Sequence, residues 1–190
     1  CDMSSDIFSQ EINVADFDLI YAGAQKNLGP AGATLYIVKD DALGKSSAQF
    51  MPTYLDLKQH IEKESMLNTP PVFSVYVAML NLRNLMANGG VDAQAQKNQA
   101  KANLLYSAID NLDAFKGNVA TEDRSLMNVT FALTDESRGA DFDALWKGAG
   151  IVGLPGHRSV GGYRASMYNA LPLESVQVLV DVMTEFNRKG

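Results

Sequence analysis

The sequence predicts an α/β fold that is divided into two domains. Patterns typical of strands and of helices alternate along the chain, without an internal repeat. Hydrophobic residues make up 46% of the sequence and charged residues 20%, which is near the average of globular proteins. The 190 residues exceed the usual size of one domain, roughly 100 to 150 residues. This length fits one large domain or two modest ones, and we place a domain boundary near Gly89-Gly90, which gives domains at residues 1–90 and 91–190.

Two strands are predicted near the start of the chain. FDLIYA (17–22) and ATLYIVK (33–39) are apolar runs of strand length, and a turn rich in Gly and Pro separates them. Lys26 lies in this connection. The opening residues, CDMSSD, are typical of the end of a strand that runs into a loop.

A helix is predicted over residues 72–86. This segment is apolar on most of its sides, so we expect it to be buried against several neighbours. Thr69 is the expected N-cap and Pro70 the expected first helical residue, because a proline loses no hydrogen bond at that position. Gly89-Gly90 is expected to end the helix, and it marks the domain boundary.

The second domain is predicted to contain three helices and two strands, of which the second is the strand-like YRASMY (163–168). A polar helix is expected over 91–112, and DFDALWKGAG (141–150) is typical of a short helix. MNVTFAL (127–133) alternates apolar and polar residues, which indicates a strand with one buried face. The last helix, over 173–188, has a single apolar stripe.

The composition argues against several classes of function. The formal net charge of −6 disfavours a general nucleic-acid or anionic-membrane surface, and no apolar run approaches the roughly 18 residues of a membrane span. Cys1 is the only cysteine, which fits a reducing cytoplasm. His60 and His157 are distant in sequence, so no metal site is expected.

Lys26 is the first candidate for chemistry. A lysine in a confined, partly dry site loses its preference for the charged form, and its amine becomes a nucleophile near neutral pH. The small residues around it in AGAQKNLGPAGA would let a planar ring lie against the backbone. The alternative is a solvated lysine on a tight turn. The stretch does not fit a phosphate-binding P-loop, which places glycines before its lysine.

The tract GHRSVGGYRAS (156–166) is the second candidate. It places His157, Arg158 and Arg164 around a Gly161-Gly162 turn. Arginine binds carboxylate or phosphate groups bidentately, so this cluster in an acidic protein predicts a pocket for a molecule with two anionic ends. The alternative is a solvated loop whose arginines pair with nearby acids.

Asp2 and the start of the 72–86 helix are the third candidate. An aspartate at the end of a strand can pair with a protonated ring nitrogen, and a helix N-terminus near Asn68-Thr69 can offer N–H groups to a phosphate. The alternative is that Asp2 is a turn residue and Thr69 a helix cap.

Together these motifs resemble the C-terminal half of the phosphoserine aminotransferases. These are pyridoxal-phosphate (PLP) enzymes of the class V aminotransferase group, with the aspartate aminotransferase-like fold (fold type I). The resemblance covers nearly all of the chain, from DMSSDI through GAQKNLGPAG and SMLNTPP to GHRSVGGYRASMYNALP. It implies the end of a large mixed-sheet domain with the interdomain helix, over 1–90, and a small α+β C-terminal domain, over 91–190.

The resemblance also implies roles in binding the PLP cofactor. Lys26 would bind PLP covalently and transfer protons during catalysis, and Asp2 would pair with the pyridinium nitrogen. Gln25 would contact the cofactor phosphate. Asn68 and Thr69 would contact the phosphate of the cofactor in the neighbouring subunit, so the active site would be shared across a homodimer.

The implied reaction is reversible amino transfer in serine biosynthesis. It connects O-phospho-L-serine and 2-oxoglutarate with 3-phosphohydroxypyruvate and L-glutamate. Arg164 would bind the substrate α-carboxylate, and His157 with Arg158 would bind the distal phosphate or carboxylate. In some bacteria the family also serves pyridoxine (vitamin B6) biosynthesis, a role that the resemblance leaves open.

Two alternatives remain beside this interpretation. Another fold-type I PLP enzyme, such as a cysteine desulfurase, needs a nucleophilic cysteine on a mobile loop, and Cys1 is badly placed for that. An inactive fragment or assembly module would keep the fold without the cofactor, but Asp2, Lys26 and Arg164 are intact. The family's N-terminal half, which supplies further cofactor and substrate contacts, is absent from this sequence, and without it we expect poor folding or no activity.

Overall fold

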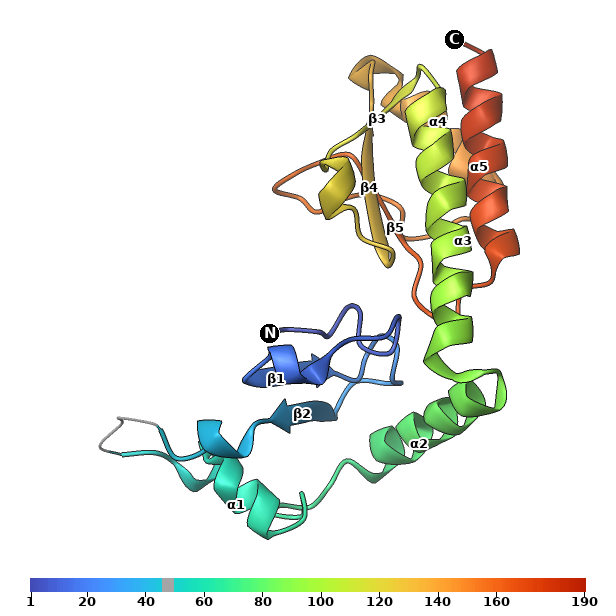
Figure 1. The fold of residues 1–190 in the computed structure, drawn as a ribbon. Coiled ribbons are helices and arrows are strands. Elements are labelled where there is room, and N and C mark those ends of the chain that lie inside the picture. The colour runs from blue at the N-terminus through green and yellow to red at the C-terminus, as the bar shows by residue number, and fades with distance from the viewer. Residues whose placement is uncertain (46–49) are drawn as a thin grey trace. The chain divides into compact units, whose positions relative to one another are not determined.

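The chain folds into two compact units, Cys1–Val91 and Asp92–Gly190, in a computed structural model that describes residues 1–45 and 50–190 (Figure 1). Each unit has its own hydrophobic core. Helices and strands occur in both units, which confirms the predicted α/β class.

The N-terminal unit is built on two antiparallel strands, β1 (Leu19–Gly23) and β2 (Thr34–Val38). Leu19 lies opposite Val38, and Gly23 lies opposite Thr34. Both predicted strands are thus confirmed. The first residues join this pair through a parallel bridge between Asp2 and Tyr21. The core of the unit is a cluster of buried apolar side chains: Met3, Ile7, Ile20, Ala22, Ala24 and Leu28.

Helix α2 (Val72–Ala87) begins later than predicted. Its N-cap is Pro71, and no side chain caps it there. Thr69 is therefore not the N-cap, and Pro70 is not the first helical residue. The reason is steric, because a residue that precedes a proline is disfavoured in the α conformation, and Pro71 imposes this on Pro70. The end of the helix is as predicted: the C-cap is Asn88, and Gly89 follows with a positive φ of 96°.

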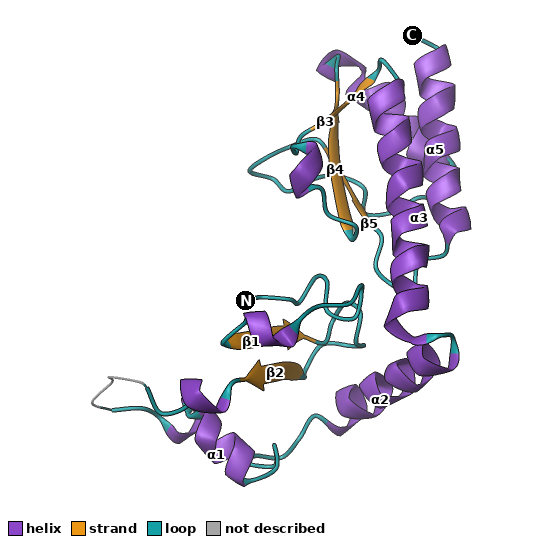
Figure 2. Ribbon diagram, in the orientation of Figure 1, coloured by secondary structure: helices purple, strands orange, loops and turns teal. Residues whose placement is uncertain are grey.

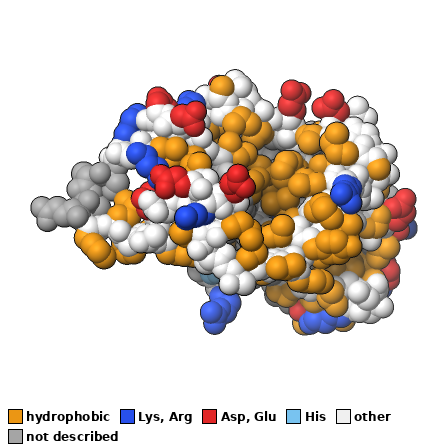
Figure 3. Space-filling model, turned by 90° about the horizontal axis from the view of Figure 1, so that it is seen from below, with side chains coloured by type: hydrophobic (Ala, Val, Ile, Leu, Met, Phe, Trp, Pro, Cys, Tyr) orange, Lys and Arg blue, Asp and Glu red, His pale blue; other side chains and the backbone are white. Residues whose placement is uncertain are grey.

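The prediction that α2 is buried is wrong for this chain. Ser74 is the only residue of the helix that is buried, while Val72, Phe73 and Met86 are 69%, 71% and 73% exposed. Residues 50–71, which include α1 (Leu57–Glu62), contain no buried residue. Apolar side chains are broadly exposed on the face that Figure 3 presents. We call the following residues the 50–86 apolar set: Phe50, Met51, Tyr54, Leu55, Ile61, Met66, Val72, Phe73, Val75, Tyr76, Leu80, Leu82 and Met86.

The C-terminal unit combines a three-stranded sheet with three helices (Figure 2). The antiparallel strands follow the order β3-β4-β5, with bounds Phe115–Gly117, Asn128–Leu133 and Tyr163–Ser166. The helices are α3 (Gly90–Asn111), α4 (Gly139–Gly148) and α5 (Leu173–Arg188). Short 3-10 helices complete the described chain, at Val14–Asp16, Asp40–Ala42, Thr53–Leu55, Thr121–Asp123 and Glu136–Arg138.

Phe142 lies in the centre of an aromatic core in this unit. It is fully buried, and its ring centroid is 4.9 Å from that of Tyr163 and 5.2 Å from those of Phe115 and Phe186. Because Tyr163 opens β5, this core supports the strand that carries Arg164.

Within the described chain, every helix is too short or too polar to cross a membrane.

Candidate functional site

Lys26 lies in the connection between β1 and β2, which backbone hydrogen bonds close into a compact turn. The Ala24 N–H donates to Ala33 O at 2.9 Å, and the Gly29 N–H donates back to Ala24 O at 2.7 Å. The Lys26 N–H also donates to Ala24 O, at 2.8 Å. The turn therefore fixes the backbone from which the lysine side chain extends.

Helix α2 holds the far side of this turn. Ser74 Oγ donates to Ala31 O at 2.7 Å, and Asn81 Nδ2 donates to Leu28 O at 2.7 Å. Gly32 has a φ of 123°, and a Cβ there would lie 2.8 Å from Ser74 Oγ, so glycine is required for this close approach. The polar face of α2 thus fixes the Lys26 turn, although most of the helix is exposed.

The side chains around Lys26 come from the first residues of the chain. Lys26 is half-buried, and its Nζ donates to Ser5 Oγ at 2.6 Å. Asp2 Oδ1 accepts the Ser4 N–H at 2.9 Å, a turn contact of the kind given above as the alternative role of Asp2. Hydrogen bonds from Ser4, aided by Tyr21 and the charge of Lys26, hold the pKa of the Asp2 carboxyl below its ordinary value. A half-buried amine and a stably ionised carboxylate therefore belong to one site.

Two further features of this site differ from what the sequence suggested. Ala22 and Ala24 are buried in the core of the unit, so their small size serves packing. Gln25 is exposed and lies over Gly23, where an added Cβ would stand 2.5 Å from Gln25 Oε1. The missing side chain of Gly23 thus makes room for the side chain of Gln25.

Asn68 and Thr69 are exposed residues of the segment between α1 and α2. Asn68 Nδ2 donates to Thr69 O at 3.0 Å. They belong to the same unit as Lys26, but they precede the first turn of α2 and are not part of it. Their side chains are therefore open to a partner.

The His157 tract forms an exposed turn in the C-terminal unit. The Val160 and Gly161 N–H groups both donate to His157 O at 2.9 Å, and His157 Nδ1 lies 2.8 Å from Ser159 Oγ. Gly161 and Gly162 have positive φ values of 74° and 63°, which favours glycine at both positions. His157 and Arg158 are exposed on this turn.

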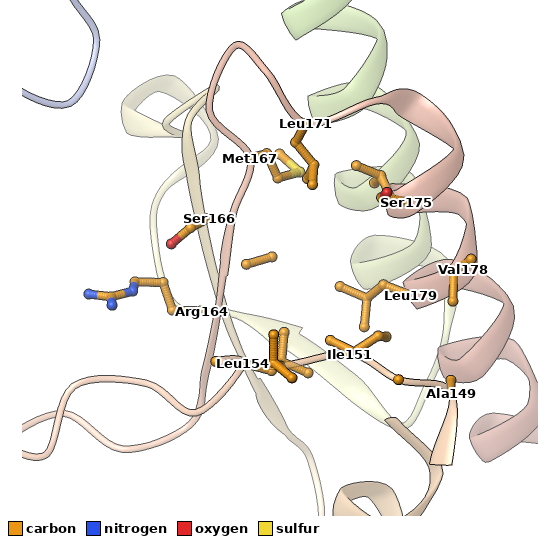
Figure 4. Close-up of a pocket in the computed structure, with 15 residues that line it drawn as sticks. Ala149, Ile151, Leu154, Arg164, Ser166, Met167, Leu171, Ser175, Val178 and Leu179 are labelled. Carbon is orange, nitrogen blue, oxygen red and sulfur yellow. The ribbon is translucent and has the colours of Figure 1, made fainter. Parts of the chain in front are cut away.

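Arg164 follows this turn on β5, where it lies opposite Thr130 of β4. It is exposed, whereas the next residue, Ala165, is buried, as expected for the two faces of a strand. The buried face borders an apolar pocket of about 360 Å³, lined by residues such as Leu154 and Leu179. Arg164 points away from this pocket (Figure 4). Its guanidinium is thus presented to solvent from an ordered strand.

The structure therefore groups the candidate residues by unit. Asp2, Gln25 and Lys26 come together in the N-terminal unit, and His157, Arg158 and Arg164 occur within ten residues of the C-terminal unit. Across residues 1–45 and 50–190, no cluster of His, Cys, Asp and Glu could hold a metal ion.

Two polar residues near Lys26, Ser5 and Asp6, are not among the predicted site residues. Ser5 binds the Lys26 amine, and Asp6 follows it, with a pKa raised by burial. The signal that could have found them is the pair of serines between two aspartates in DMSSD (2–6), at the start of the sequence.

Comparison with known proteins gives consistent matches over the whole chain. The Aminotransferase class-V family model matches residues 1–179. Phosphoserine aminotransferase from Flavobacterium johnsoniae is 60% identical over 189 residues, which cover 100% of this chain and 53% of that protein. The corresponding enzyme from Porphyromonas gingivalis is 53% identical over 190 residues, covering 99% of this chain and 52% of that protein.

Solved structures agree. Phosphoserine aminotransferase from Bacillus circulans subsp. alkalophilus matches with a TM-score of 0.93 at 44% identity, over 99% of this chain and 52% of that one. The PLP-bound enzyme from Trichomonas vaginalis matches with a TM-score of 0.89 at 36% identity, over 96% and 52%. The chain thus spans about half the length of the curated relatives it matches. The predicted resemblance and fold are confirmed, and the chain belongs to the class-V aminotransferase family.

Proposed function

We propose that the chain is the C-terminal half of a PLP-dependent phosphoserine aminotransferase. The enzyme would transfer an amino group between O-phospho-L-serine with 2-oxoglutarate and 3-phosphohydroxypyruvate with L-glutamate, in serine biosynthesis in the cytoplasm. The observation that supports this best is the half-buried Lys26 amine in one site with the Asp2 carboxylate, in a chain similar to such enzymes throughout its length.

The residues around Lys26 fit PLP. The Lys26 amine, held by Ser5 Oγ, would bind the cofactor aldehyde covalently. The Asp2 carboxylate, with its lowered pKa, would accept a hydrogen bond from the protonated ring nitrogen, and Gln25 would contact the phosphate. When bound, PLP supplies an electron sink for negative charge at the substrate Cα. The freed Lys26 amine would then move the Cα proton as general base and acid.

The cations of the C-terminal unit fit substrates with two anionic ends. Arg164 would bind the α-carboxylate from its place on β5, and His157 with Arg158 would bind the distal phosphate or carboxylate from the exposed turn. A turn with two glycines at positive φ suits a site that must accept both a phosphate and a carboxylate.

The enzyme would also need two protein partners, its own N-terminal half and a second subunit. The 50–86 apolar set supports this, because soluble monomers rarely expose so many apolar side chains in one segment. Asn68 and Thr69, in the same segment, would reach the cofactor phosphate of the neighbouring subunit in a homodimer. A parallel role in pyridoxine biosynthesis is part of the proposal, since it would use the same amino transfer on a related phosphorylated substrate.

Borohydride reduction of the PLP-loaded enzyme, assembled with its N-terminal half, tests the proposal. Mass spectrometry should find the reduced cofactor on Lys26, and the Lys26→Ala variant should lose at least about 100-fold in phosphoserine-dependent glutamate formation. Lys39→Ala is the matched control, because Lys39 lies in the same unit and pairs with Asp18 at the surface, at 3.3 Å. A label on another lysine, or an unlabelled protein, contradicts the assignment.

A further inference from the structure

Lys101 is a buried cation that the proposed chemistry does not use. It lies on α3, and only 1% of its surface is exposed. Its Nζ donates to Met167 O at 3.0 Å and to Tyr168 O at 2.9 Å. Among the residues that the structure describes, no carboxylate pairs with it. A buried charge without a counter-charge is costly, so the position calls for a specific role.

Lys101 is one of three polar residues on the same face of α3. Gln94, Asn98 and Lys101 are spaced by four and three residues, which places them in one row along the helix. Asn98 Nδ2 donates to Asn169 Oδ1 at 2.9 Å, and Gln94 Nε2 donates to Asn169 O at 3.3 Å. The row therefore holds the segment 167–169 through side-chain hydrogen bonds.

The segment 167–169 directly follows β5, the strand that carries Arg164. On this strand the Arg164 N–H donates to Leu154 O, and beyond its end the Met167 N–H donates to Met127 O, both at 2.7 Å. β5 has only four residues, so its position depends strongly on what fixes its two ends. At the first end, Tyr163 OH donates to Asp143 Oδ1 at 3.1 Å. At the second end, Lys101 binds two consecutive carbonyl groups.

We propose that Lys101 is a positioning residue for Arg164. Lys101 holds the end of β5, so that the guanidinium of Arg164 is ordered where the substrate carboxylate binds. The inference rests on the proposed function, in which Arg164 binds that carboxylate. An amine with several N–H donors can bind both carbonyl groups at once, which a methionine of similar length cannot do. Without Lys101, Met167 O loses its side-chain donor, whereas Tyr168 O keeps the Leu171 N–H at 2.9 Å.

Lys101→Met is the test variant, and Lys97→Met is the matched control on an exposed position of the same helix. Hydrogen–deuterium exchange of the assembled, PLP-loaded enzyme should be about threefold or more faster at the N–H groups of residues 164–167 in Lys101→Met. It should be unchanged there in Lys97→Met. Unchanged exchange in both variants overturns the proposal, whatever the activity.

Steady-state kinetics separate positioning from a merely structural role. In Lys101→Met, KM for both glutamate and 2-oxoglutarate should rise by about 3- to 10-fold, because all substrates share the α-carboxylate, while kcat changes by less than about twofold. The PLP absorbance spectrum should not change, because Lys26 is untouched. Faster exchange with unchanged KM, or an equal loss in kcat, overturns the link to Arg164. A wild-type enzyme without transamination activity instead refutes the proposed function, and the exchange data then decide alone whether Lys101 orders the strand.

Discussion

The stability of the protein should increase with pH through a contribution from Lys101. Burial lowers the pKa of the Lys101 ammonium from 10.5 to about 8. Between these values the folded chain has released the proton and the unfolded chain still holds it, so unfolding takes up a proton and becomes less favourable as pH rises. The full gain in unfolding free energy is about 3 kcal/mol, and about 2 kcal/mol of this gain is acquired between pH 7 and pH 9.5.

Urea unfolding of the enzyme assembled with its N-terminal half, as wild type and as Lys101→Met, at a series of pH values measures this contribution. The difference in unfolding free energy between the two proteins should grow by about 2 kcal/mol in favour of wild type from pH 7 to pH 9.5. Taking the difference cancels the pH-dependent contributions of the titratable groups that both proteins share. The pH range ends at 9.5 to avoid the titration of tyrosines. Their raised pKa values, about 12 for Tyr163, make stability fall as pH rises. A difference that does not vary with pH would refute the inferred burial of the charge.

Further predictions concern the aromatic core and the turn before β5. Phe142→Ala should lower the unfolding free energy by about 3 to 5 kcal/mol, since it leaves a cavity among buried rings, and urea unfolding measures it. Gly161→Ala and Gly162→Ala both place alanine at positive φ, but only at Gly162 would the Cβ meet a backbone atom, Phe131 O at 2.7 Å. Gly161→Ala should therefore cost about 1 kcal/mol and Gly162→Ala clearly more, and equal melting temperatures would contradict this.

The elements that the sequence predicted best are those whose pattern and environment agree. Met127, Val129, Phe131 and Leu133 alternate in the sequence, and all four are buried on one face around β4. The helix predicted over 173–188 has the bounds of α5. In both cases the apolar face packs against other elements of the same unit. The apolar pattern in the sequence therefore corresponds to burial in the structure.

The elements that were misjudged depend on information outside the local pattern. The apolar run 72–86 predicts a helix, but it does not say whether this chain supplies the residues that would cover it. β3 has only three residues, too few for an alternating pattern to be recognised. Helix α1 was not predicted, because its charged sequence has no clear apolar face.

The candidate site also contains residues that a local motif predicts and residues that only distant contacts reveal. Motifs at Lys26 and in the 156–166 tract led to the candidate residues, because their chemistry is concentrated in short stretches. Ser5 and Lys101 act through contacts with residues that are 21 and 66 or more positions away, so no local motif marks them. One signal for Lys101 was available: with Asn98 it continues the stripe of buried Leu105 and Ile109 along α3, where a cation is unexpected.

The 50–86 apolar set has a practical consequence for anyone who produces these 190 residues by themselves. Surfaces of this kind are bound by chaperones and associate with one another before a slower, correct partner arrives. We expect the chain to accumulate in inclusion bodies when it is expressed alone, and to stay in solution when the N-terminal half is synthesised in the same cell. Solubility would then report on assembly before any catalytic measurement is made.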